Sequence, residues 1–161
     1  MIRHAAMSDA DFIAGIYNYY VVNTAITFEE EMLSAEQMEK RIGEVNSAAL
    51  PWLVAEQSGR IVGYAYASKW KTRSAYRFSV ESAIYLQDGA GGKGVGGKLY
   101  AELLPALKER GVHVVIGGIA LPNQSSVALH EKFGFRKVAH FEEVGFKFGR
   151  WLDVGYWQKV L

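Results

Sequence analysis

The spacing of apolar residues predicts two helices near the start of the chain. Between residues 8 and 23 apolar side chains recur three and four positions apart, which places them on one helical face. Ser8 is expected to be the N-cap of this helix, with an acidic residue three positions on. The predicted buried face comprises Phe12, Ile13, Ile16, Tyr17, Tyr20 and Val21. The second helix is predicted to start near Ser34, where Gln37 completes a capping-box pattern, and to run through Val45.

Extended segments follow these helices. Trp52–Glu56 and Ile61–Ser68 flank Ser58-Gly59-Arg60, which is typical of a hairpin turn. Another extended run, Tyr76–Leu86, ends at a glycine-rich segment. A short first strand is also predicted at Ile2–Ala5.

The second half of the chain predicts two more helices and three strands. A helix over Val95–Arg110 is expected to kink at Pro105, because proline interrupts the helical hydrogen bonds, and to end before Gly111. Val112–Ile119 is apolar without alternation, which predicts a central strand covered on both faces. The remaining helix and strands are expected at Asn123–Phe133, which Gly134 ends, and at Phe135–Val138 and Trp151–Val160.

The order of predicted elements is therefore β-α-α-β-β-β-α-β-α-β-β. Such an order indicates an α/β fold in which helices pack on a mixed sheet. The chain has 161 residues, of which half are apolar and 13% aromatic, so one domain over 1–161 with a single well-filled core is expected. The net charge of +1 offers no basic surface for nucleic acid.

Composition also excludes several kinds of chemistry. The chain has no cysteine, which rules out disulfides, thiolate zinc sites and a cysteine nucleophile. His4, His113 and His140 look structural, and no metal is expected because no pair of histidines has ligand spacing on one face. The N-terminus lacks the apolar core of a signal peptide, and no apolar run approaches the ~20 residues that span a bilayer. A cytoplasmic protein that does not bind membranes is expected.

Glycine is the one compositional excess that points to a site. Six of the nine residues from Gly89 to Gly97 are glycine, and they lie between a predicted strand and a predicted helix. Glycines let the backbone approach a ligand closely, and the first N–H groups of the helix point at it with the positive end of the helix dipole. The segment therefore predicts an anion-binding loop rather than a simple surface turn.

Two nucleotide-binding motifs fit this loop only in part. Gly92-x-x-x-x-Gly97-Lys98 nearly matches a nucleoside-triphosphate loop, but Leu99 stands where Ser or Thr would hold Mg²⁺. The pattern GxGxxG occurs in two frames, which start at Gly89 and at Gly92. A dinucleotide fold would place an acidic residue after the next strand, and this chain has Ile119-Ala120-Leu121-Pro122 there.

A third pattern extends beyond the loop. Gly92-Lys93-Gly94-Val95-Gly96, then Asn123, then Leu129-His130-Glu131-Lys132-Phe133-Gly134-Phe135 resembles the GCN5-related N-acetyltransferases (GNAT). The resemblance implies the GNAT acyl-CoA N-acyltransferase fold, with a central mixed, mostly antiparallel sheet flanked by helices, and acetyl-CoA as co-substrate. The pyrophosphate would be held by Gly92, Lys93, Gly94, Val95, Gly96 and Gly97, with Asn123 also touching the coenzyme. The pantetheine arm would pair with Ile84, Tyr85 and Leu86 like an added strand.

Further motifs are similar to one branch, the phosphinothricin and methionine sulfoximine acetyltransferases. They are Ile16-Tyr17-Asn18, Thr27-Phe28-Glu29, Arg73-x-Ala75-Tyr76-Arg77, Val80-Glu81-Ser82 and Val144-Gly145-Phe146-Lys147-Phe148-Gly149-Arg150-Trp151-x-Asp153, and together they cover nearly all of the chain. This resemblance implies acetyl transfer to the amine of a small amino acid or analogue, of the phosphinothricin, methionine sulfoximine or methionine sulfone type, by a homodimer. The chain departs from the branch at Gly91, where Arg or Gln is usual, and at Ala83, where a small hydroxyl residue is usual. The first departure predicts weaker coenzyme binding.

Two residues are candidates for acid–base catalysis. An amine must lose a proton before it attacks a thioester, and Glu81, among apolar neighbours that would raise its pKa, is the candidate base. The pattern alone fits equally a glutamate on the solvent face of an edge strand, and the resemblance favours the base. His130 occupies the place of a tyrosine in related transferases, where it could protonate the leaving thiolate. A histidine near the coenzyme with no catalytic part is the alternative.

The acceptor site is expected around a basic cluster and its neighbours. Arginine binds carboxylates in a bidentate manner, so a basic run just before Glu81 suits an amino-acid substrate, although such runs are more often solvated loops. The candidate substrate-binding residues are Phe28, Glu29, Lys71, Thr72, Arg73, Tyr76, Arg77, Glu81, Ser82 and Ala83.

Two other functions also fit the sequence. The departures at Gly91 and Ala83 also fit a non-catalytic coenzyme A-binding sensor or partner module. An acetyltransferase that acts on a polyamine or a protein N-terminus is the other alternative. The arginine cluster counts against a cationic acceptor, because like charges repel.

Overall fold

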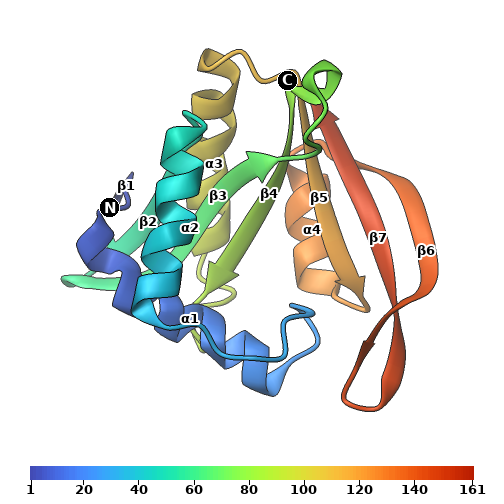
Figure 1. Cartoon of the computed structure of the whole chain (residues 1–161), viewed down its shortest axis with the longest axis horizontal. Coiled ribbons are helices and arrows are strands. Elements are labelled where there is room, and N and C mark those ends of the chain that lie inside the picture. Colours follow the sequence, from blue (N-terminus) through green and yellow to red (C-terminus); the bar gives the residue numbers. More distant parts are fainter.

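A computed structural model describes all residues from 1 to 161 and shows one seven-stranded sheet in the order β1-β2-β3-β4-β5-β7-β6 (Figure 1). The elements are β1 (Ile2–His4), α1 (Ala10–Asn23), α2 (Ala35–Ser47), β2 (Trp52–Gln57), β3 (Arg60–Lys69), β4 (Ser79–Leu86), α3 (Val95–Glu109), β5 (Val114–Leu121), α4 (Gln124–Lys132), β6 (Arg136–Lys147) and β7 (Arg150–Val160). Every neighbouring pair of strands is antiparallel except β4 and β5. The expected order of elements and the mixed, mostly antiparallel sheet are therefore confirmed.

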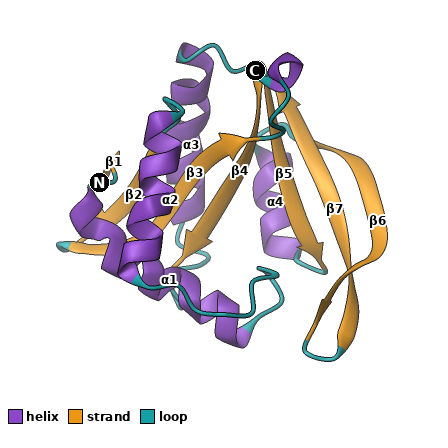
Figure 2. Ribbon diagram, in the orientation of Figure 1, coloured by secondary structure: helices purple, strands orange, loops and turns teal.

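Helices cover both faces of this sheet, α1 and α2 on one and α3 and α4 on the other (Figure 2). The side chains of strand β2 alternate between the two faces of the sheet, so this strand contributes to the core on each side. Trp52 and Val54 belong to the core formed with α1 and α2, whereas Leu53 and Ala55 belong to the core formed with α3. This strand is buried from both sides and anchors the two layers to each other.

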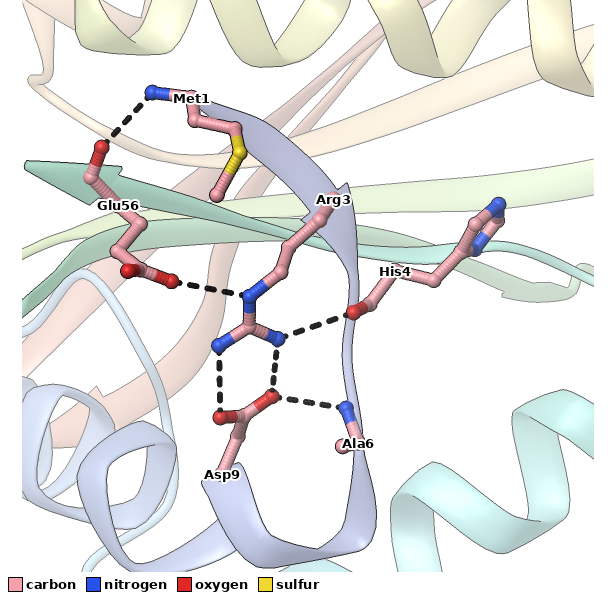
Figure 3. A network of polar contacts seen from close by, with 6 residues as sticks. All are labelled: Met1, Arg3, His4, Ala6, Asp9 and Glu56. Carbon is pink, nitrogen blue, oxygen red and sulfur yellow. Dashed lines mark hydrogen bonds and ion pairs between the residues drawn. The ribbon is translucent and has the colours of Figure 1, made fainter. Parts of the chain in front are cut away.

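An ion network at the N-terminus connects β1 to β2 and to the residue that precedes α1 (Figure 3). The Arg3 guanidinium donates to Asp9 Oδ2 at 2.7 Å, to Asp9 Oδ1 at 3.0 Å and to Glu56 Oε2 at 3.0 Å. Its hydrogen bonds hold the pKa of the Asp9 carboxyl below its ordinary value. Asp9 also accepts from the Ala6 N–H and precedes α1 as its N-cap, so the prediction of Ser8 as N-cap was wrong.

The first three helices otherwise follow their sequence signals, with two differences. Ser34 accepts from the Gln37 N–H and caps α2 as predicted. Phe12 is 62% exposed and does not belong to the buried face of α1. Helix α3 continues through Pro105 to Glu109, and Gly111 follows its end with a left-handed φ of 79°.

Three predicted strands differ from those observed. Residues 74–76 form a 3₁₀ turn, so β4 starts at Ser79 rather than at Tyr76. Strand β6 is far longer than the predicted Phe135–Val138, because register shifts along β6 obscure its pattern. The prediction that the strand at Val112–Ile119 is covered on both faces was wrong in part. Val115 and Ile119 of β5 are buried, but Gly118 is exposed.

Candidate active site

The site lies where two parallel strands separate. β4 and β5 pair only through Ser79–Glu81 and Val114–Ile116. Both strands continue, to Leu86 and Leu121, but they diverge toward these ends (Figure 1). Beyond Glu81 the backbone groups of β4 that face β5 have no strand partner, so an extended ligand could pair with them.

Two cavities, of about 280 and about 850 Å³, meet in this opening. The smaller one lies near the end of the paired region and includes Glu81. The larger one is lined by the glycine-rich loop and the first turn of α3. Both are lined by Ile26, Ile84, Tyr85, Asn123 and Ser126. They therefore form one channel that connects the loop with Glu81.

Backbone geometry makes the larger cavity suitable for an anion. Gly89, Gly92 and Gly94 have φ between 73° and 79°, a region that disfavours residues with a side chain. Gly94 is the N-cap of α3, so the first N–H groups of this helix start at the cavity wall. The first turn of α3 is also close to α4, because a Cβ at Gly96 would lie 3.3 Å from Leu129.

Asn123 forms the opposite wall of the channel. It is the N-cap of α4, and its Oδ1 accepts from the Ser126 N–H at 3.2 Å and from the Ser125 hydroxyl at 3.1 Å. The starts of α3 and α4 thus lie on two sides of the same cavity. Of the residues predicted to bind the pyrophosphate, Lys93 alone does not line this cavity.

Glu81 has the surroundings expected of a base. Burial raises the pKa of its carboxyl, and the positive charge of Lys71 opposes the rise. Its Oε1 lies 3.2 Å from where a Cβ at Gly118 would be, and the Tyr156 ring is 3.1 Å from the same point. The glycine on β5 therefore leaves the carboxylate room to reach into the channel.

Two residues near Glu81 were missed by sequence reasoning. Ser68 and Tyr66 of β3 line the smaller cavity, and their Cα partners on β4 are Glu81 and Ala83. Burial raises the pKa of Tyr66 to about 12, which keeps its hydroxyl protonated as a donor. The one signal in the sequence is that their strand comes directly before the strand of Glu81, but the register that brings the residues together depends on contacts across the sheet.

His130 lies on the other side of β5. It is 3% exposed, and a Cβ at Gly117 would come within 2.7 Å of its Nε2. Nδ1 is 2.7 Å from the Ser126 carbonyl oxygen, and Nε2 is 2.9 Å from the Tyr100 hydroxyl. Burial holds the pKa of the imidazole below its ordinary value. Tyr100 was also missed, because it lies among the leucines of an apolar helix face.

The predicted acceptor residues separate into two groups. Ser82 and Ala83 line the smaller cavity together with Glu81. The others line neither cavity: they are Phe28, Glu29, Lys71, Thr72, Arg73, Tyr76 and Arg77. Residues 71–77 are exposed between β3 and β4. The Lys71 ammonium lies over the Trp70 ring and the Arg77 guanidinium over the Phe78 ring. Whether they touch substrate stays a prediction.

Phe28 and Glu29 belong to the segment between α1 and α2. The Phe28 ring lies against Gly145, where no Cβ could fit, and Glu29 forms a 2.7 Å ion pair with Arg41. Ile26 of the same segment lines both cavities. The segment therefore walls the channel through a residue that the sequence did not single out.

Metal and membrane features are not found. No three histidine, aspartate or glutamate side chains are grouped so that they could hold a metal ion. None of the helices combines the length and the hydropathy needed to cross a bilayer.

Comparison with known proteins gives consistent results over the whole chain. The family model for the acetyltransferase (GNAT) domain matches residues 2–155. Phosphinothricin N-acetyltransferase of Streptomyces coelicolor is 37% identical, over 99% of this chain and 95% of its own length. The L-methionine sulfoximine/L-methionine sulfone acetyltransferase of Salmonella typhimurium is 34% identical, over 99% of this chain and 94% of its own length.

Solved structures match equally well. A phosphinothricin acetyltransferase from Sinorhizobium meliloti in complex with acetyl-CoA superposes with a TM-score of 0.97 at 38% identity, over 100% of this chain and 88% of that one. A ribosomal-protein-alanine N-acetyltransferase from Brucella melitensis gives a TM-score of 0.97 at 39% identity, over 100% of this chain and 99% of that one. The channel between β4 and β5 is thus built on a fold that similar chains share.

Proposed function

Because this chain belongs to the GNAT family of acetyltransferases, we propose that it moves the acetyl group of acetyl-CoA to the amine of a small amino acid or analogue. Phosphinothricin, methionine sulfoximine and methionine sulfone are the acceptor types that the similar enzymes suggest. The observation that carries the proposal is the single channel that joins the glycine-rich loop to Glu81 through the opening between β4 and β5.

The loop end of the channel suits the coenzyme. The N–H groups at Gly92–Gly97 would hold the pyrophosphate, with Lys93 adding charge from outside the cavity and Asn123 contacting the coenzyme from α4. The pantetheine arm would lie along Ile84–Leu86, whose backbone on the β5 side has no strand partner. This arrangement would bring the thioester to the smaller cavity.

Glu81 is the proposed general base. An amino acid presents a protonated amine near neutral pH, and the buried carboxylate would take one proton from it directly or through a water. The neutral amine would then attack the thioester carbonyl carbon. Backbone N–H groups of β4 beyond Glu81 would stabilise the oxyanion that forms, since they point into the opening and have no strand partner.

The acceptor residues outside the cavities favour a homodimer. The β6–β7 hairpin at the sheet edge exposes Phe146, Phe148 and Trp151 to 53%, 58% and 63%. Apolar exposure of this kind is typical of an interaction surface. A second copy of the chain would cover it, and would enclose the exposed basic segment 71–77 so that Arg73 and Arg77 could bind an acceptor carboxylate. A cytoplasmic location belongs to the same proposal.

The experiment is a turnover assay that measures free-thiol release from acetyl-CoA. The acceptors are phosphinothricin, methionine sulfoximine, methionine sulfone and a panel of L-amino acids, with spermidine and an alanine-initiated peptide as contrasts. We expect turnover with one or more amino-acid analogues and none with spermidine. Tight acetyl-CoA binding without turnover of any amino acid or analogue would overturn the assignment.

A protein N-terminus is the second candidate acceptor. It is favoured by the similarity to the Brucella melitensis structure described as a ribosomal-protein-alanine N-acetyltransferase. Faster turnover of the alanine-initiated peptide than of any free amino acid would support it. The departures at Gly91 and Ala83 are what favours a coenzyme-binding sensor without catalysis. Glu81 counts against it, because its carboxylate lines the channel and burial raises its pKa.

A further inference from the structure

A chain of hydrogen bonds runs from the smaller cavity into the protein. The Ser82 hydroxyl is 3.1 Å from the Tyr100 hydroxyl, which is 2.9 Å from His130 Nε2. His130 Nδ1 is in turn 2.7 Å from the Ser126 carbonyl oxygen. All three side chains line the cavity, yet they are no more than 6% exposed, so the hydrogen bonds between them are largely shielded from solvent.

The last bond fixes the direction of the whole chain. A carbonyl oxygen can only accept, so His130 Nδ1 carries a proton. In a neutral imidazole Nε2 is then an acceptor, which makes the Tyr100 hydroxyl its donor. The Tyr100 oxygen is left to accept from Ser82. The cavity therefore meets the lone pairs of Ser82 and no free donor, so in this state the chain can accept a proton but cannot supply one.

The chain and Glu81 reach the channel from opposite faces of the sheet. Gly118 of β5 faces Glu81, whereas its neighbour Gly117 faces His130. Successive residues of a strand point to opposite faces, so the two groups are separated by the strand itself. The opening between β4 and β5 lets one reacting centre contact both.

We propose that Ser82, Tyr100 and His130 form a relay that carries a proton from the attacking nitrogen to the departing sulfur. The proposal rests on the proposed function and assigns its second proton transfer. Glu81 takes the first proton, when the ammonium becomes an amine. Attack then forms the C–N bond and leaves one surplus proton on nitrogen. Collapse of the intermediate breaks the C–S bond and leaves the electron pair on sulfur.

The relay neutralises both the positive charge on nitrogen and the negative charge on sulfur. The surplus proton passes to the Ser82 oxygen as the proton of Ser82 moves to Tyr100 and that of Tyr100 moves to His130 Nε2. The imidazolium then has two N–H groups, and the cavity end of the chain becomes a donor. The reverse movement returns one proton to the thiolate and restores the neutral imidazole, with no oxidant or reductant involved.

The acidities of the groups favour this direction. Ordinary pKa values of about 6.5 for imidazole and about 8.5 for a thiol make the imidazolium about 100-fold the stronger acid. Burial lowers the pKa of His130 further, which keeps the relay neutral at rest and speeds delivery to the thiolate. Burial causes this lowering of the pKa, the hydrogen bond to the Ser126 carbonyl opposes it, and no charged side chain contributes.

The test removes single atoms from the relay. Tyr100→Phe deletes one oxygen and keeps the ring that stacks on Phe135, and Ser82→Ala is a milder second variant. We expect kcat to fall on the order of 10- to 100-fold in each, while the KM for acetyl-CoA stays within about twofold. Tyr100→Phe combined with His130→Gln should be no slower than the slower single variant, because the three residues act as a unit. Tyr19→Phe, which removes an exposed hydroxyl without a hydrogen bond, should be unchanged.

Two readouts separate a relay from a structural role. In mixtures of H₂O and D₂O, a plot of kcat against the deuterium fraction should be curved for the parent enzyme, since several protons move together. The same plot should be a straight line for Tyr100→Phe. The ¹⁵N resonances of His130 in the free protein should show a protonated Nδ1 and a bare Nε2. A straight line for the parent, multiplicative losses in the double variant or the opposite tautomer would each overturn the relay. Absence of turnover with every acceptor would refute the proposed function and the relay together, whereas turnover with one of these three results would refute the relay alone.

Discussion

The two ends of the channel are built by different means. The coenzyme end is formed by backbone: glycines with positive φ, the start of α3 and the unpaired stretch of β4. The acceptor end is formed by side chains from distant parts of the chain, among them Ile26, Tyr66 and Glu81. A backbone site needs only one continuous segment to fold, whereas a side-chain site needs several segments in register. The first should tolerate change in its neighbours, and the second should not.

The largest effect is expected at the point where the two ends meet. Glu81→Gln removes the carboxylate and keeps its volume, so kcat should fall by ~10²- to 10⁴-fold while the dissociation constant of acetyl-CoA stays unchanged. Steady-state kinetics and calorimetric titration measure the two quantities. Equal losses in both would show that the coenzyme and acceptor ends are not separable.

The same residue predicts the pH dependence. Burial raises the pKa of Glu81, and a base works only when it is deprotonated, so activity should be lost on acidification through a pKa above the ordinary value of about 4.3. The charge of Lys71 lowers this pKa, so Lys71→Ala should move the acid limb of kcat/KM to higher pH. An acid limb that does not move would mean that another group titrates.

A glycine substitution should damage the coenzyme end alone. Gly94 caps α3 with a φ of 78°, and Gly94→Ala would have to adopt this left-handed conformation at a cost of about 1–2 kcal/mol. The coenzyme should bind about 5- to 30-fold more weakly, with the KM of the acceptor little changed. Gly59→Ala imposes the same left-handed strain, with a φ of 74°, in the turn between β2 and β3 away from both cavities, so it is the matched control and should leave coenzyme binding unchanged.

How far each end could be predicted from sequence follows from its construction. The sequence could place the loop, Asn123 and the unpaired β4 residues at the channel because their signals are local, namely glycine clusters, helix caps and strand ends. Glu81 could be placed in the channel from its motif, but Tyr66 and Ser68 could not, since their approach to it depends on the register of β3 against β4. His130 was placed near the coenzyme from its motif, whereas Tyr100 in α3 could be linked to it only in three dimensions. The Phe28–Gly145 contact joins residues more than 100 positions apart, which no local pattern reveals.

That last contact gives a test specific to the acceptor end. Gly145→Ala would push a methyl group into the Phe28 ring, and overpacking of this kind costs about 1–3 kcal/mol. The segment that carries Ile26 should shift, so the KM of the acceptor should rise about tenfold while that of acetyl-CoA is unchanged. Combining it with Phe28→Leu, which shortens the opposing ring, should restore part of the loss.

Lys147 holds the same segment by another bond. Its side chain is buried and donates to the Thr27 carbonyl at 2.9 Å, so Lys147→Met should give a similar rise in the KM of the acceptor. Hydrogen exchange of residues 24–34 should also become faster. Val138→Ala, at an exposed position of the same strand outside the proposed dimer surface, is the control. Equal effects of Lys147→Met and Val138→Ala would argue that the hairpin, and not this bond, sets the acceptor wall.

The smallest effect should be a gain at the coenzyme end. Gly91 lines the larger cavity, its φ is not left-handed, and a Cβ there would meet nothing within 4 Å, so Gly91→Arg fits without strain. Its guanidinium could add a charge-assisted hydrogen bond to the pyrophosphate. Because the position is exposed, the gain should be only about 2- to 10-fold in the dissociation constant and should shrink as salt screens the charge. Gly91→Ala isolates the loss of backbone freedom from the added charge. A dissociation constant in Gly91→Arg that is unchanged or raised relative to Gly91→Ala would mean that the loop amides already satisfy the phosphates, so that the coenzyme end is complete without a side chain.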